Sequence, residues 1–185
     1  GNNCHTLSQS NTREALNQIS ADLSVDINKA RVTRIDFSTN IITDYTPTIY
    51  YPYLGQLSNF RRLVNPDSIY YNQKAKRLLF YDKIAEAKSK KMDIPVEYIG
   101  KNLLRYELVL NKDVPRFLDY KVISGKDLYS EGLYRKLLHL WHSYYKQIQK
   151  HSKQYKIMAD NIKTPKDVES VLFKAMVRKN PLEVK

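Results

Sequence analysis

Residues 102–110 read NLLRYELVL, and the alternation of side chains in this stretch decides the fold class. Apolar side chains occupy every second position, at Leu104, Tyr106, Leu108 and Leu110. Arg105 and Glu107 stand between them. Because successive side chains of a β-strand point to opposite faces of a sheet, the stretch predicts a strand with one apolar face and one polar face.

Residues 31–40 alternate in the same way and place Arg34, Asp36 and Ser38 on a polar face. They predict a second strand. The Tyr-, Thr- and Ile-rich stretch 45–53 predicts another. Its two prolines cannot donate hydrogen bonds to a neighbouring strand, so we expect this strand at an edge or interrupted.

A β-hairpin is predicted from residues 68–82. The stretches 68–72 and 77–82 are rich in strand-forming residues and flank the polar turn 73–76. The second of these strands runs directly into 83–91, a basic segment with helical character.

Helices are predicted on both sides of these strands. Thr12 can cap a helix that runs to Leu23, and Asp127 or Ser130 can cap a long amphipathic helix. The apolar stripe of the long helix comprises Leu133, Leu137, Leu140, Trp141, Tyr144 and Ile148. Thr164 followed by Pro165 begins a last helix.

Together these elements predict an α+β fold in which helices cover one face of an antiparallel sheet of four or five strands. The open face would carry the candidate active site. We expect an N-terminal lead and helix at 1–30, a sheet core at 31–120 and C-terminal helices at 121–185 that pack on the core. A length of 185 residues is that of one domain.

The chain is basic, with 31 Lys and Arg against 19 Asp and Glu and a formal net charge of +12. Such a field attracts polyanions, of which nucleic acid is the commonest in a cell. Fifteen of the aromatic residues are tyrosines. Tyrosines on an exposed sheet face can stack on unpaired bases, although they are also ordinary strand formers.

The single cysteine, Cys4, excludes an internal disulfide, and the sequence has no CxxC or Cys/His cluster for zinc. No apolar stretch approaches the roughly 18 residues that cross a bilayer, and the first residues lack the charged and apolar regions of a signal peptide. We therefore expect a cytoplasmic protein with no membrane partner. Because the chain begins with Gly rather than Met, we expect that it is a fragment and that residues precede it.

Motifs of common enzyme classes are absent from the sequence, including glycine-rich phosphate loops, GxSxG and HExxH. What remains is a polar set on the predicted open face, namely Asp36, Tyr81 and Glu107. Two carboxylates can hold a hard cation such as Mg²⁺ or Mn²⁺. The cation would neutralise a phosphodiester, and a tyrosine oxygen is a competent nucleophile. Lys83 and the arginines Arg34 and Arg105 could lower the tyrosine pKa or hold neighbouring phosphates.

The chain resembles the phage and plasmid replication initiators of the gene II/X family in three ordered blocks: VTRIDFSTN at 32–40, KRLLFYDKIAE at 76–86 and LLRYELVLNKDVPRFL at 103–118. The blocks contain Arg-x-Asp, Tyr-x-Lys-x-x-Glu and Arg-x-Glu in that order. A more distant similarity is to the rolling-circle initiators of Gram-positive plasmids. The resemblance covers residues 10–150.

The resemblance implies a site-specific DNA endonuclease and ligase. Such an enzyme nicks one strand of a rolling-circle origin, stays joined to the 5′ phosphate through tyrosine and leaves a 3′ hydroxyl for synthesis. The nucleophile would be Tyr81, with Lys83 beside it. The acids that bind Mg²⁺ or Mn²⁺ would be Asp36 and Glu107, with Glu86 as a third.

The expected partner is origin DNA, single-stranded at the nick, and a host helicase or polymerase is a further candidate. Charge alone predicts phosphate contacts from Arg61, Arg62, Lys88, Lys90 and Lys91. Arg34 and Arg105, which stand two residues before the two acids, are predicted to contact DNA as well.

Two alternatives stay open at this point. One is a truncated or degenerate initiator that binds DNA without cleaving it, and the other is an unrelated basic module that binds RNA or protein. A nickase requires the Tyr81 oxygen and the carboxylates of Asp36 and Glu107 around one cavity. An unrelated module would instead use both acids in local salt bridges with Arg34 and Arg105.

Overall fold

The structure is a computed structural model, and it describes residues 7–151. Those up to Lys150 lie in one compact unit, Gly1–Lys150. The unit contains a five-stranded antiparallel sheet in the order β1-β5-β4-β3-β2. The strands are β1 (Ile35–Thr43), β2 (Arg61–Asn65), β3 (Ser68–Asn72), β4 (Lys76–Asp82) and β5 (Asn102–Leu110). The predicted α+β class is confirmed.

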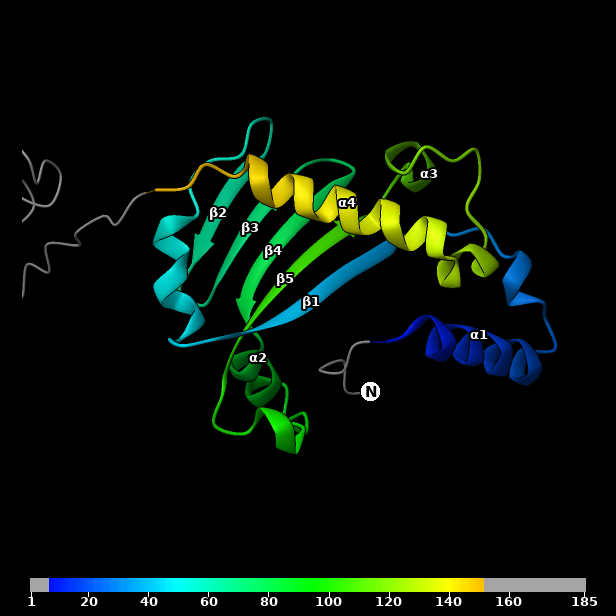
Figure 1. Cartoon of the computed structure of the whole chain (residues 1–185), viewed down its shortest axis with the longest axis horizontal. Helices are drawn as coiled ribbons and strands as arrows, with labels where there is room; N and C mark the ends of the chain where they lie inside the picture. Colours follow the sequence, from blue (N-terminus) through cyan, green and yellow to red (C-terminus); the bar gives the residue numbers. More distant parts are fainter. Residues whose placement is uncertain (1–6, 152–185) are drawn as a thin grey trace, which may run out of the picture. The chain divides into compact units, whose positions relative to one another are not determined.

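Four α-helices accompany the sheet in the described residues, α1 (Gln9–Leu23), α2 (Lys83–Ser89), α3 (Val114–Phe117) and α4 (Glu131–Gln147). The 3₁₀ turns are η1 (Ile27–Lys29), η2 (Pro47–Tyr53), η3 (Val96–Tyr98) and η4 (Gly125–Tyr129). Figure 1 shows α4 lying across one face of the sheet and α2 at the end of β4. In residues 7–151 no helix combines the length and the apolar character that a membrane span requires.

The sequence correctly predicted β5, the β3–β4 hairpin and α4. The long helix is capped by Ser130, whose hydroxyl accepts a hydrogen bond from the Leu133 amide at 3.3 Å. The helix predicted to begin at Thr164 lies outside the described residues. The first helix begins at Gln9, earlier than predicted, because Ser8 and Asn11 form a capping box.

The prediction of a strand at 45–53 was wrong. Residues 47–53 form the 3₁₀ helix η2, with Pro47 at its start and Pro52 inside it. A proline fixes φ near the helical value and withholds a ladder donor, so both residues favour a tight helix over a strand. The fifth strand is instead β2, a short edge strand with mostly exposed residues.

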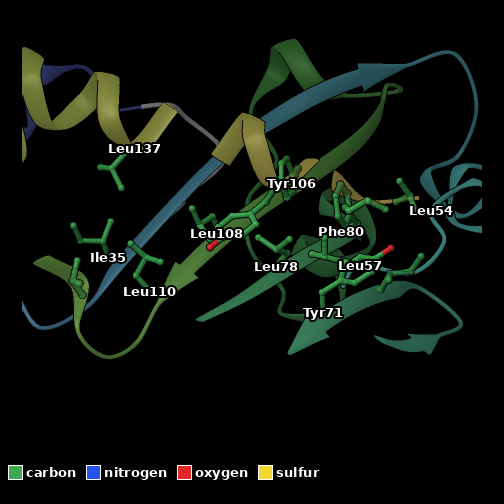
Figure 2. Close-up of a cluster of buried hydrophobic side chains, with 14 of the residues drawn as sticks. Ile35, Leu54, Leu57, Tyr71, Leu78, Phe80, Tyr106, Leu108, Leu110 and Leu137 are labelled. Carbon is green, nitrogen blue, oxygen red and sulfur yellow. The ribbon is translucent and has the colours of Figure 1, made fainter. Parts of the chain in front are cut away.

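The core lies between the sheet and α4, and Figure 2 shows its central side chains. Phe80 of β4 stacks on Tyr106 of β5, with ring centroids 4.3 Å apart and planes 3° from parallel. The Tyr106 ring also meets Trp141 of α4 at 4.5 Å, and its hydroxyl donates to the Trp141 carbonyl oxygen at 2.9 Å. Stacked rings of this kind contribute about 0.5–1.5 kcal/mol beyond the burial of their area. These ring contacts attach α4 to β4 and β5.

Gly125→Ala is predicted to destabilise the protein. A Cβ at this position would lie 2.2 Å from the Ile27 carbonyl oxygen, a backbone atom that cannot move aside cheaply. Overpacking of this kind lowers the free energy of unfolding by about 1–3 kcal/mol. Chemical denaturation measures the change. Gly132→Ala is the control, since its nearest contact is 3.7 Å away on the Tyr120 hydroxyl, and equal destabilisation of both variants would contradict the prediction.

Candidate active site

Strand alternation places a polar group of residues on the sheet face opposite α4. In the register of the sheet, Arg105 of β5 stands opposite both Asn40 of β1 and Tyr81 of β4. Glu107 stands opposite Ser38 of β1. Since Phe80 and Tyr106 face α4, their neighbours Tyr81, Arg105 and Glu107 face the other way.

A pocket of about 190 Å³ opens beside this group. Its lining comes from β3, β4, β5, α2 and the turn before β3, and comprises Asp67, Ser68, Tyr70, Leu79, Tyr81, Asp82, Glu86, Ser89 and Glu107. Three predicted site residues, Tyr81, Glu86 and Glu107, therefore share one pocket. Another pocket of about 280 Å³, lined by residues 31–33 and 111–115, contains none of the predicted site residues.

The Tyr81 hydroxyl is the centre of the pocket chemistry. It donates a hydrogen bond to Oε2 of Glu107 at 3.3 Å. The same oxygen lies 3.4 Å from Nε of Arg105. Burial raises the pKa of Tyr81 well above its usual value, and the charges of Glu107 and Glu86 raise it further while Arg105 lowers it. The hydroxyl is therefore protonated at neutral pH, and an attack by its oxygen requires the proton to leave.

The acid Glu86 reaches the pocket from α2. This helix begins immediately after β4 because the Asp82 carboxylate accepts hydrogen bonds from the amides of Ile84 and Ala85, each at 2.9 Å. Lys83 is fully buried and forms an ion pair with Oε2 of Glu86, and Lys90 contacts Oε1 at 2.6 Å. Burial alone would raise the Glu86 pKa, but the hydrogen bonds from the two lysines lower it.

Lys83 also lies near the predicted nucleophile, with its ammonium nitrogen 6.0 Å from the Tyr81 ring centroid. Its charge is balanced by Glu86, as a buried cation requires. The Lys83 side chain therefore lies near the Tyr81 ring, while its ion pair is with Glu86.

Asp36 occupies a different part of the sheet face opposite α4. It stands opposite Val109, and its carboxylate binds Arg34 through two hydrogen bonds of 2.7 Å. Strand spacing and rise place its Cα roughly 16 Å from that of Tyr81. The structure thus does not bring Asp36 to the Tyr81 pocket, although it is a diagonal neighbour of Glu107 on the next strand. Its role as a metal ligand stays a prediction.

The donors of the pocket are carboxylate and hydroxyl oxygens, the type that Mg²⁺ and Mn²⁺ prefer. Among residues 7–151, however, no three His, Cys, Asp or Glu side chains come close enough together to hold a metal ion. Glu107 is the acid nearest the Tyr81 hydroxyl, so it is the first candidate ligand.

The predicted DNA-contact residues fall into two groups. Arg61 of β2 is exposed, as are Lys88 and Lys91 at α2, and all three can reach a phosphate. The other four are less accessible to DNA: Arg34 is paired with Asp36, Lys90 with Glu86 and Arg105 with Glu107, and Arg62 is half-buried.

Sequence reasoning missed five polar residues that line the pocket: Asp67, Ser68, Tyr70, Asp82 and Ser89. The signal for Tyr70 was present in the sequence. It stands opposite Leu79, which stands opposite Glu107, so strand alternation places it on the same face of the sheet as Glu107. The other four depend on the turn before β3 and on the position of α2.

Glu107→Gln is predicted to lower the Tyr81 pKa toward the ordinary tyrosine value in metal-free protein. The carboxylate disfavours the tyrosinate, and the amide removes that repulsion. An NMR titration of the Tyr81 ring carbon, assigned with Tyr81→Phe, measures the change. Asp36→Asn is the matched control, because Asp36 does not line the pocket, and an equal fall in both variants would contradict the assignment.

Comparison with known proteins identifies a family whose model covers the whole sheet. A family model for phage proteins, described as the N-terminal region of a replication-associated protein, matches residues 5–131. This range contains β1 to β5 and every predicted site residue. No curated protein and no solved structure matches the chain significantly.

Proposed function

Because this chain belongs to the family of phage replication-associated proteins whose N-terminal region it matches, we propose that it initiates replication by nicking and rejoining one strand of a rolling-circle origin. The supporting observation is the Tyr81 hydroxyl bound to Glu107 in an open pocket that also contains Glu86. A tyrosine beside a proton acceptor at a solvent-accessible pocket is the arrangement that nucleophilic transesterification needs.

In the proposed step, the Tyr81 oxygen attacks a phosphodiester phosphorus. A bond forms between this oxygen and phosphorus as the bond from phosphorus to the 3′ oxygen breaks. Glu107 accepts the tyrosine proton, and the departing 3′ oxygen takes up a proton from water to become a hydroxyl. The 5′ end stays joined to Tyr81, so reversal of the step rejoins a strand without a nucleotide cofactor.

A divalent cation fits this chemistry, and we propose that Glu107 and Glu86 hold Mg²⁺ or Mn²⁺ at the pocket. A bound cation would neutralise the phosphodiester charge and favour the tyrosinate. A carboxylate has two oxygens, so Glu107 can face both the cation and the tyrosine proton. Lys83 and Lys90 form ion pairs with Glu86.

The proposed DNA contacts are exposed basic side chains of β2 and of the α2 region. Exposed Arg61, Lys88 and Lys91 are the proposed phosphate contacts. A net charge of +12 makes the affinity strongly dependent on salt.

Tyr81→Phe is predicted to abolish nicking, lowering the rate by more than about 10³-fold as the loss of a nucleophile does. The assay follows supercoiled DNA from the protein's own replicon and scores relaxed circles and protein-linked 5′ ends. Tyr70→Phe is the matched control, since Tyr70 lines the same pocket and is expected to retain nicking.

A second candidate function is an initiator-like protein that occupies an origin without cutting it. It is favoured by the ion pairs of Asp36, Glu86 and Glu107, each of which is already balanced by a basic side chain. Tight binding of the same DNA without relaxed circles, with Mg²⁺ or Mn²⁺ supplied, would replace the nickase proposal by this one.

Removal of divalent cations with a chelator is predicted to stop nicking, and Mg²⁺ or Mn²⁺ is predicted to restore it. Calorimetric titration of the metal alone provides a readout that does not depend on cleavage. Glu107→Gln should weaken metal binding because one of the oxygen ligands loses its charge. Nicking that persists at full rate in excess chelator would rule out the metal role.

A further inference from the structure

Arg105 was predicted from its charge to contact DNA, but the structure places it inside the protein. Only 9% of the residue is exposed. A cation that is withdrawn from water needs partners to offset the loss of hydration. Its partners come from β1 on one side and from β5 itself on the other.

The partners on β1 are two small polar side chains in register with the site. Nη2 of Arg105 donates to the Ser38 hydroxyl at 2.5 Å, and Nη1 donates to Oδ1 of Asn40 at 3.2 Å. Ser38 stands opposite Glu107, and Asn40 stands opposite Arg105. The planar guanidinium is thereby held across the strand boundary by two separate contacts.

The third guanidinium nitrogen of Arg105 lies near the acid that binds the predicted nucleophile. Nε of Arg105 lies 3.4 Å from Oε2 of Glu107, the oxygen that accepts the Tyr81 hydrogen bond. A carboxylate on a flexible side chain is useful as a proton acceptor only if it is held in one place. Arg105 can hold Glu107 because Ser38 and Asn40 hold Arg105.

We infer that Arg105 is a positioning residue, which fixes the Glu107 carboxylate against the Tyr81 hydroxyl from an anchor on β1, and is not a phosphate contact. The inference rests on the proposed nickase function. It also gives Ser38 and Asn40 a role that depends on the pairing of β1 with β5.

The test compares Arg105→Gln with Arg61→Gln, which removes an exposed arginine proposed to contact phosphate. Two quantities are measured with the single-stranded origin of the protein's own replicon: the nicking rate at saturating DNA, and the slope of log affinity against log salt. Arg105→Gln should slow nicking roughly 10- to 100-fold, as the loss of an outer-shell partner does, with an unchanged slope. Arg61→Gln should instead reduce the slope by about 0.7.

Ser38→Ala and Ser38→Thr make the test independent of whether Arg105→Gln folds. Ser38→Ala should slow nicking without changing the salt slope, and Ser38→Thr, which keeps the hydroxyl, should restore the rate. The positioning role is overturned if Arg105→Gln reduces the salt slope as Arg61→Gln does, or if Arg105→Gln and Ser38→Ala nick at the wild-type rate. Absence of nicking in the wild-type protein would instead remove the proposed function, and this role with it.

Discussion

The pairing of β4 with β5 is the constraint on which both the core and the candidate site depend. Phe80 stands opposite Tyr106 and stacks on it beneath α4, while the next pair, Tyr81 and Arg105, faces the other side of the sheet. A slip of one residue in this register would exchange the two faces of a strand. The aromatic stacking that stabilises the core therefore also keeps the predicted nucleophile at the pocket.

Charge compensation is the second organising feature of the sheet face opposite α4. Carboxylates repel an approaching phosphate, so their charge has to be offset where a polyanion binds beside them. In this structure Arg105 accompanies Glu107, and two lysines accompany Glu86. One of these, Lys83, is fully buried, which is tolerable because its charge is paired within the protein. The basic residues in contact with the acids of the pocket thus form ion pairs with them, and the exposed basic residues are the ones proposed to contact DNA.

Strong local patterns were sufficient for much of the fold. The alternation in 102–110 correctly predicted a strand, and the amphipathic stripe of 133–148 correctly predicted a helix. Each pattern is reliable because it repeats several times along its element. The stretch 45–53 was misread since tyrosine and threonine favour strands, while two prolines imposed a 3₁₀ helix. The edge strand β2 was not predicted because its five residues are mostly exposed and carry little alternation.

Which residues share a face within each strand could be read from the sequence, because alternation is a local property of the extended chain. Alternation thereby assigned Tyr81, Arg105 and Glu107 to one side of the sheet. Strand order and register, which set Asp36 apart from Tyr81, required the tertiary structure, as did the position of α2, which brings Glu86 into the pocket. The burial of Arg105 also required the tertiary structure, because it depends on neighbours that are distant in sequence.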